Sequence, residues 1–132
     1  MRMRTVPVFL TVLCLTMLLL SGSLFAQVKE VKIGVLYPLS GAQATIGRDL
    51  QRAAEVMAEV INNKTPGVDL PMAQWGGIPG LGGAKIKLIF ADHRGEPDRG
   101  ADLAKKLILD DKVAGLMGAY QRSVTTTVRA VA

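Results

Sequence analysis

The chain contains 132 residues, carries a formal net charge of +5, and has one cysteine and one histidine. Its basic residues are dispersed among Asp and Glu rather than gathered into a run, which argues against a nucleic-acid-binding surface. A single cysteine can form neither an intramolecular disulfide nor a multi-cysteine metal site.

The first 26 residues predict a secretory signal peptide. Arg2 and Arg4 form a short basic region, residues 6–20 are uncharged and mostly apolar, and small residues follow. This order is typical of a cleaved export signal, and the uncharged run is shorter than the ~20 apolar residues of a membrane-spanning helix. Cleavage is expected after Ala26 or after Ser23, and it would lower the net charge from +5 to +3 by removing Arg2 and Arg4.

The cysteine lies inside this predicted signal peptide. Cys14 follows Leu13 in the middle of the apolar run, whereas a lipoprotein signal places a small residue directly before its cysteine near the end of the run. We therefore expect export to the periplasm or another extracytoplasmic space without a lipid anchor, and a mature chain without thiol chemistry.

The remaining residues, 27–132, alternate between predicted strands and helices. Short apolar runs rich in β-branched residues indicate strands, and apolar residues spaced three and four apart indicate helices. The expected strands are 31–37, 85–92 and 113–120, and the expected helices are 48–61, 97–109 and one that begins near Ser123. Ser123 is the expected N-cap of that last helix. Residues 64–83 form a loop rich in Gly and Pro, in which we expect Trp75 to pack against the body of the domain.

This β-α-β-α-β-α order predicts an α/β fold with an open parallel sheet and helices on both faces. Right-handed crossovers place the first strand between the other two, which gives the strand order 2-1-3. The loops after the first and third strands then diverge from neighbouring strand ends, where open α/β sheets bind ligands. The loop with His93 is expected to lie further out, with His93 as a capping or surface residue.

Both of the neighbouring loops carry small hydroxyl residues near a predicted helix start. Ser40 and Gly41 follow the first strand, and Ser123 and Thr125 follow the third. Backbone N–H groups and the positive end of a helix dipole make such a corner suitable for binding a carboxylate or a similar polar group. The alternative is that both serines only cap their helices.

Other kinds of chemistry lack their sequence patterns. No G-x-G-x-x-G follows the first strand, no phosphate-binding P-loop is present, and no set of Cys and His has metal-ligand spacing. The sequence therefore predicts a protein that binds no cofactor or metal and is not an enzyme.

Three segments, in this order, resemble the periplasmic substrate-binding proteins of ABC transporters for branched-chain amino acids, amides and related small polar solutes. They are residues 31–41, residues 91–97 and residues 118–125. The resemblance extends from Val31 to Ala132 and implies a type I periplasmic binding fold whose two lobes close on a ligand. It further implies a receptor that delivers its solute to an ABC permease in the inner membrane, with residues 27–132 forming part of the first lobe.

The resemblance also implies where the solute binds. Its carboxylate and amine would contact the loop after the third strand, with Ser123 as the nearest match to the family's anchor. The residues expected to contribute there are Tyr120, Gln121, Arg122, Ser123 and Thr125. The loop with Ser40 and Gly41 would border the same cleft. Two departures concern the ligand: Ile46 stands where the family often has an aromatic residue, and Arg122 stands where it usually has a small polar one. The arginine fits either a more acidic ligand or a side chain that points to solvent.

Two other functions remain compatible with the sequence. The same fold forms the ligand-sensing domain of receptors and regulators, which a transmembrane or signalling segment after Ala132 would indicate. An exported α/β enzyme would need catalytic residues in that same region. The chain stops inside its last predicted helix, so we expect it to be the front part of a longer protein and to be marginally stable as an isolated piece.

Overall fold

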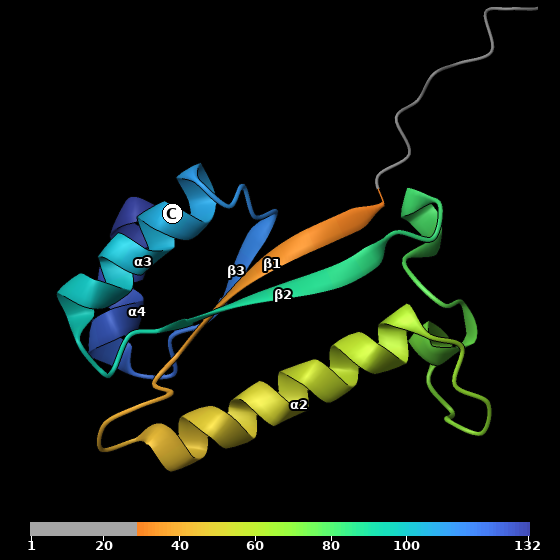
Figure 1. Cartoon of the computed structure of the whole chain (residues 1–132), viewed down its shortest axis with the longest axis horizontal. Coiled ribbons are helices and arrows are strands. Elements are labelled where there is room, and N and C mark those ends of the chain that lie inside the picture. The colour runs from red at the N-terminus through yellow and green to blue at the C-terminus, as the bar shows by residue number, and fades with distance from the viewer. Residues whose placement is uncertain (1–28) are drawn as a thin grey trace, which may run out of the picture.

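The structure is a computed structural model that describes residues 29–132. A parallel sheet forms the middle layer (Figure 1), with α2 (Ala44–Asn62) on one face and α3 (Pro97–Leu109) and α4 (Arg122–Val131) on the other. The predicted signal peptide lies outside the described residues. The expectation of helices on both faces is confirmed.

Strand β1 (Glu30–Tyr37) lies in the centre of the sheet, between β2 (Lys85–Asp92) and β3 (Gly115–Gly118). Both pairings are parallel, and the register places Tyr37 beside Asp92 and Leu36 beside Gly118. The predicted strand order 2-1-3 is therefore confirmed. Because the strands are parallel, the loops that follow them all leave from the same end of the sheet, at the carboxyl ends of the strands.

The central position of β1 explains its apolar sequence. Val35 and Leu36 point to opposite faces of the sheet, and both are almost completely buried. A parallel strand that is covered on both faces reads as a continuous apolar run rather than as an alternating one. Strand β2 alternates at its beginning, as an edge strand does, because Lys85 and Lys87 are exposed there.

The main core lies between the sheet and the α3–α4 pair. Its buried members are Leu36, Ala104, Leu107, Ala119, Val124 and Val128. Gly100 lets the two helices approach closely, since a Cβ at this position would lie 2.4 Å from Val124 Cγ1. The Thr127 hydroxyl donates a hydrogen bond of 2.7 Å to the Pro97 carbonyl and so joins α4 to the start of α3.

Helix α2 begins earlier than the sequence predicted. It starts at Ala44, whereas we expected a start near Arg48. The first turn contains small residues and lies against the end of β1, so it adds nothing to the amphipathic pattern that starts at Leu50. Gly47 makes this approach possible, because a Cβ there would lie 2.1 Å from the Pro38 carbonyl oxygen.

Strand β3 is shorter than predicted. It covers only four residues, where the expected strand was 113–120. The backbone leaves the strand conformation because Gly118, Ala119 and Tyr120 all have positive φ, at 114°, 68° and 47°. These residues form a turn that leads directly into α4.

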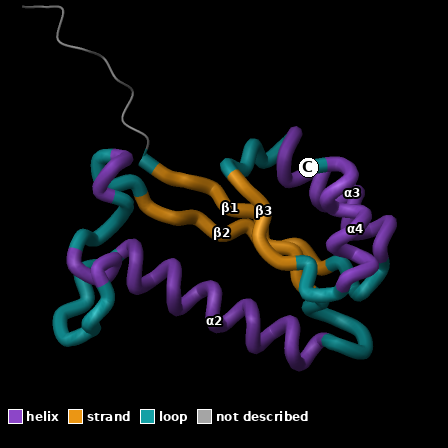
Figure 2. The backbone as a smooth tube through the Cα atoms, turned by 180° about the vertical axis from the view of Figure 1, so that it is seen from behind, coloured by secondary structure: helices purple, strands orange, loops and turns teal. Residues whose placement is uncertain are grey.

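The long segment between α2 and β2 contains two short 3₁₀ helices, η1 (Pro71–Gln74) and η2 (Pro79–Leu81). It lies at the end of the sheet opposite the loops that follow the strands (Figures 1 and 2). The expectation that Trp75 packs against the body is wrong, because Trp75 is 62% exposed. Ala73 is the residue of η1 that is buried, so the tryptophan ring is left on the outer side of the turn.

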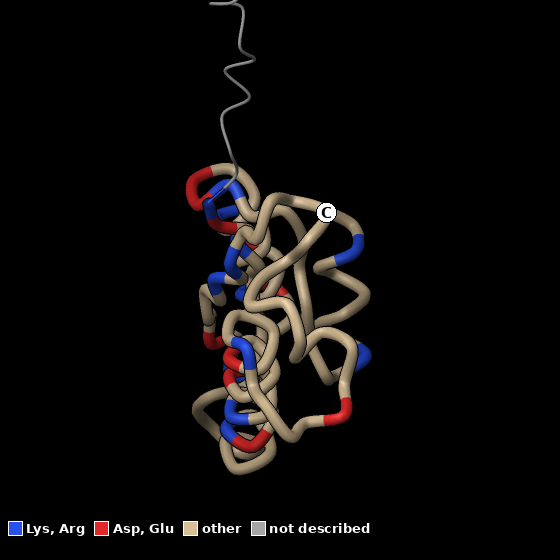
Figure 3. Tube along the Cα trace, turned by 90° about the vertical axis from the view of Figure 1, so that its right-hand side faces the viewer, with Lys and Arg blue, Asp and Glu red and all other residues tan. Residues whose placement is uncertain are grey.

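Charged residues of both signs are spread over the molecule. Figure 3 shows Lys and Arg interleaved with Asp and Glu along the described chain. Within residues 29–132, no helix combines the length and the apolar character needed to cross a membrane.

Candidate functional site

Three loops follow the carboxyl ends of the strands, and we refer to them by number. Loop 1 comprises residues 38–43 after β1, loop 2 comprises residues 93–96 after β2, and loop 3 comprises residues 119–121 after β3. Loop 1 is central because β1 is the central strand. The structure therefore brings the starts of loops 1 and 3 together, as the sequence predicted, and the Ala119 N–H donates a 2.7 Å hydrogen bond to the Leu36 carbonyl.

The carboxylate of Asp92, at the end of β2, holds loop 1. Its Oδ1 accepts hydrogen bonds from the N–H groups of Leu39 at 2.9 Å and Ser40 at 3.3 Å. Its Oδ2 accepts the Ser40 hydroxyl at 2.5 Å. The Arg94 N–H donates to Oδ1 at 3.0 Å, and the Arg94 Nε lies 3.9 Å from Oδ2. The carboxylate thus joins loop 1 to loop 2.

These contacts set the ionisation of the carboxyl group. Burial alone would raise the pKa of Asp92, but hydrogen bonds from the Ser40 hydroxyl and from three backbone N–H groups stabilise the charged form. The net result is a pKa below the ordinary value for aspartate. Asp92 is therefore ionised at neutral pH and acts as an acceptor for all of these donors.

Sequence reasoning did not include Asp92 among the candidate site residues. It placed Asp92 at the end of the second strand and in the segment 91–97 that carries the resemblance, but it assigned the carboxylate no partner, because its partners in loop 1 lie more than 50 positions away in the chain. The available signal was an acidic residue at the carboxyl end of a strand that is parallel to and beside the first one.

We had expected the loop with His93 to lie further out, with His93 as a capping or surface residue. Instead, His93 lies beside the end of β1 and is not at the surface. Its side chain is completely buried. Its backbone N–H donates to the Tyr37 carbonyl at 3.3 Å, and its Nδ1 accepts the Gly95 N–H at 3.0 Å. This second bond closes a turn within loop 2 and does not cap α3, whose N-cap is Glu96. The correction follows from the register, which places the end of β2 directly beside the end of β1.

Burial lowers the pKa of His93, and the Asp92 carboxylate and the backbone of His93 and Ala119 oppose that shift without cancelling it. The ring is therefore neutral at physiological pH. Since Nδ1 accepts a hydrogen bond, the proton lies on Nε2, which is buried and has no hydrogen-bond partner within the described residues.

Loop 2 also contacts loop 3. Gly95 has a φ of 84°, and a Cβ at this position would lie 2.9 Å from Gln121 Nε2. The Gln121 Oε1 is a second buried atom without a hydrogen-bond partner in the described part of the chain. Loop 2 thus contacts both of the loops that the sequence singled out, because Arg94 shares the Asp92 carboxylate with loop 1 and Gly95 lies against Gln121 of loop 3.

Loop 3 has a strained backbone. Ala119 and Tyr120 both occupy the left-handed region, which costs a residue other than glycine of the order of 1–3 kcal/mol. The methyl group of Ala119 is buried in the core, whereas Tyr120 is 53% exposed. Such conformations persist where the surrounding structure imposes them, and they are common at ligand-binding loops. The turn places the tyrosine ring at the surface beside the start of α4.

The start of α4 corrects one prediction about Ser123. The N-cap is Gln121, one residue before the helix, and Ser123 is the second helical residue. Thr125 makes the first intrahelical bond, since its N–H donates to the Gln121 carbonyl at 2.9 Å, and its hydroxyl donates to the same oxygen at 3.0 Å. The N–H groups of Arg122, Ser123 and Val124 therefore precede the helical bonding pattern and have no carbonyl partner in α4.

The remaining predicted site residues lie around these loops. Ser123 and Arg122 are exposed, and no hydrogen bond engages the Ser123 hydroxyl within residues 29–132. Gly41 has a φ of 79° and its carbonyl accepts the Ala44 N–H at 3.1 Å, so it turns loop 1 into α2. Ile46 is 39% exposed on the first turn of α2.

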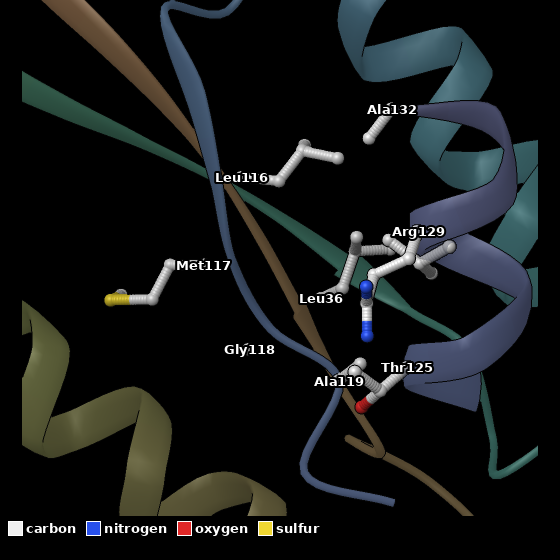
Figure 4. Close-up of a pocket in the computed structure, with 9 residues that line it drawn as sticks. Leu36, Leu116, Met117, Gly118, Ala119, Thr125, Arg129 and Ala132 are labelled. Carbon is white, nitrogen blue, oxygen red and sulfur yellow. The ribbon is translucent and has the colours of Figure 1, made fainter. Parts of the chain in front are cut away.

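Two cavities flank β3, one on each side of the sheet. The first, of about 220 Å³, lies between β3 and α4 (Figure 4) and is lined by Leu36, Thr125 and Arg129, among others. The second, of about 300 Å³, lies between α2 and the sheet. Thr125 is the one predicted site residue that lines either cavity, so these two cavities are separate from Ser40 and Ser123. Within residues 29–132, no group of three or more His, Cys, Asp or Glu side chains could hold a metal ion.

Comparison with known proteins identifies the family. A sequence model of the periplasmic binding protein family matches residues 30–132. The chain belongs to the periplasmic binding protein family. The resemblance to it that the sequence suggested is thereby confirmed, and so is the type I periplasmic binding fold, through the solved structures that share it.

The proteins that this chain is similar to are named for, or were solved with, different ligands. A "Leu/Ile/Val-binding protein homolog 3" of Brucella melitensis is 35% identical over 67% of this chain. The branched-chain amino acid substrate-binding protein LivJ of Streptococcus pneumoniae, solved with isoleucine, has a TM-score of 0.64 and 26% identity over 78% of this chain. A solute-binding protein of an ABC transporter from R. palustris, solved with benzoate, has a TM-score of 0.59 and 25% identity over 77% of this chain. The chain covers only 20% of the Brucella protein and 26% and 24% of the two solved chains.

Proposed function

We propose that this chain is part of the first lobe of an extracytoplasmic solute receptor that serves an ABC importer. Its family membership supports this function, since the relatives are solute-binding proteins rather than enzymes. In this proposal residues 1–26 are the export signal, the protein is not a lipoprotein, and the partner is a permease in the inner membrane.

The observation that carries the proposal is the free start of α4, which directly follows loop 3. Three N–H groups without a helical carbonyl partner, the exposed Ser123 hydroxyl and the positive end of the α4 dipole all lie there. This combination stabilises an anion without reacting with it. We therefore infer that the solute carries a carboxylate and that this carboxylate binds at Ser123.

Two residues bear on the class of solute. Arg122 occupies the first position of α4, where a cation opposes the helix dipole unless an anion is bound nearby. Tyr120 presents an exposed ring in the same loop. These residues suit a small carboxylic acid with an apolar or aromatic body. LivJ with isoleucine and the R. palustris protein with benzoate provide the two compounds to compare.

The test is isothermal titration calorimetry of the full-length protein with isoleucine and with benzoate, followed by Ser123→Ala. Losing one hydroxyl donor to a carboxylate is expected to weaken binding by about 10-fold. Thr126→Ala is the matched control, because this hydroxyl lies on the same helix but bonds to the Arg122 carbonyl. Equal losses in both variants, or unchanged affinity in Ser123→Ala, would contradict a carboxylate site at Ser123.

A further inference from the structure

The Ser40 hydroxyl is already engaged in the structure. It donates its proton to Asp92 Oδ2 at 2.5 Å, which is the short distance typical of a hydroxyl bonded to a charged carboxylate. A hydroxyl has only one proton to donate. Ser40 can therefore not donate to a solute carboxylate while this bond exists, even though loop 1 borders the candidate site.

Asp92 in turn receives most of its hydrogen bonds from loop 1. Of the four donors on its carboxylate, three come from Leu39 and Ser40, and the fourth comes from the Arg94 N–H in loop 2. An ionised carboxylate has about four acceptor sites, so these donors come close to saturating it. The carboxylate is therefore not available as a ligand for a solute amine.

We propose that Asp92 is a positioning residue that fixes loop 1 as a wall of the candidate site, and that the Ser40 hydroxyl holds loop 1 on Asp92 rather than binding the solute. We call this hydrogen bond between Ser40 and Asp92 the latch. This inference rests on the proposed function, since it needs loops 1 and 3 to bind the solute. It assigns two roles that contact distances support: Asp92 sets the position of loop 1 relative to the sheet, and the Ser40 hydroxyl keeps it there.

The test is a double-mutant cycle on the full-length protein, with solute affinity measured for Ser40→Ala, Asp92→Ala and the combined variant. Asp92→Ala is expected to lower affinity by about 10-fold or more, and Ser40→Ala by less, because the two backbone bonds to Asp92 remain. Adding Ser40→Ala to Asp92→Ala is expected to change affinity by less than about twofold. If Ser40→Ala instead weakens solute binding by the same factor in the Asp92→Ala protein as in the wild type, Ser40 contacts the solute itself and the latch is refuted.

A conservative variant separates position from simple loss of stability. In Asp92→Asn, the amide oxygen can still accept the backbone N–H groups, and the amide nitrogen can donate to the Ser40 oxygen. We expect this variant to retain affinity within a few-fold of the wild type, above Asp92→Ala. Asp102→Asn is the control for loss of one negative charge, because Asp102 is an exposed residue of α3 that forms an ion pair with Lys105 on the same helix. Asp92→Asn binding as weakly as Asp92→Ala would overturn the positioning role.

Hydrogen exchange of loop 1 supplies a readout that needs no solute. The amides of Leu39 and Ser40 are expected to exchange at least about tenfold faster in Asp92→Ala than in the wild type, with the core amides of β1 unchanged. If the wild type binds neither isoleucine nor benzoate while exchange in loop 1 rises as expected, the proposed ligand class fails and the latch stands. If exchange in loop 1 is unaffected, the latch itself is wrong.

Discussion

His93 is a buried titratable group at the meeting point of the three loops. Its ring is neutral in the folded protein because burial lowers its pKa. In the unfolded chain the same ring has an ordinary pKa near 6.5. As the pH falls below about 6.5 the unfolded state therefore takes up a proton that the folded state resists, and the free energy of unfolding decreases. The stabilisation by the neutral ring is complete above the pKa of the unfolded chain, and it is lost as the pH falls toward the lower pKa of the folded state.

We expect His93→Asn to flatten this pH dependence. The asparagine Oδ1 can still accept the Gly95 N–H, but the side chain no longer titrates. Urea unfolding between pH 5 and pH 7.5 gives the free energy of unfolding as a function of pH. Its slope is expected to be steeper in the wild type than in the variant, by an amount that corresponds to up to about one proton taken up on unfolding. His93 is the only histidine of the sequence, so no other imidazole contributes. Parallel slopes would mean that the folded state protonates the ring as easily as the unfolded state does.

Single residues mark the limit of what the sequence could predict. The position of Ser123 near the start of a helix was predictable from its context, but its exact role was not, because the turn at Ala119 and Tyr120 moves the cap to Gln121. The engagement of Ser40 by Asp92 depends on strand register and on a rotamer. Neither leaves a periodic pattern in the chain.

At the scale of elements, the end of α2 protects the free edge of β2. The Asn62 side chain pairs with both polar groups of one β2 residue: it donates to the Ile86 carbonyl at 2.7 Å and accepts the Ile86 N–H at 2.6 Å. An edge strand otherwise presents unpaired N–H and carbonyl groups. One amide side chain thus takes the place of a neighbouring strand at this position and joins α2 to the sheet.

Asn62→Leu is expected to destabilise the protein by about 1–3 kcal/mol, because it leaves two partly buried backbone groups without partners. Asn63→Ala is the matched control, since its side chain makes one exposed hydrogen bond to the Glu59 carbonyl, and it should cost less than about 0.5 kcal/mol. Chemical denaturation of both variants measures the difference. Similar losses would show that the amide pairing contributes little.

The elements themselves were largely predictable, and their ends were not. The apolar runs of β1 and β2 and the amphipathic stripes of α2 and α3 carry periodic signals that local physics reads directly. The first turn of α2 lacks such a stripe because it packs through Gly47 against Pro38. The prediction that Trp75 is buried was wrong for a similar reason, since the glycine-rich segment around it has no periodic pattern that would indicate which side chains face the body of the domain.

At the scale of the whole molecule, stability is expected to decrease from the centre of the sheet to its β3 edge. Strand β1 is hydrogen-bonded on both sides, whereas β3 has four residues and one strand partner within the described chain. The topology that produces this gradient followed from the βα alternation and right-handed crossovers alone. The contacts between loops could not be derived in the same way, because they require the side chains to be placed.

Hydrogen exchange of the wild-type protein without ligand tests this gradient. The amides of Val35 and Leu36 are expected to exchange at least about tenfold more slowly than those of Leu116 and Met117, because local opening of a short edge strand breaks few contacts. Mass spectrometry of peptic peptides resolves the two strands. Equal protection of β1 and β3 would show that the sheet opens as one unit.

The exposed position of Trp75 determines which optical signal can follow solute binding. It is the only tryptophan in the sequence, and the segment between α2 and β2 that contains it lies at the end of the sheet opposite loops 1 and 3 (Figures 1 and 2). Its emission is dominated by a solvated ring remote from the candidate site, so intrinsic tryptophan fluorescence of this region would remain nearly silent on titration. The two tyrosines of the sequence, by contrast, are Tyr37 at the end of β1 and Tyr120 in loop 3. Only Tyr120 is exposed in the loop where the proposed solute would bind, so the absorbance and ring resonances of this tyrosine are the native probes of binding.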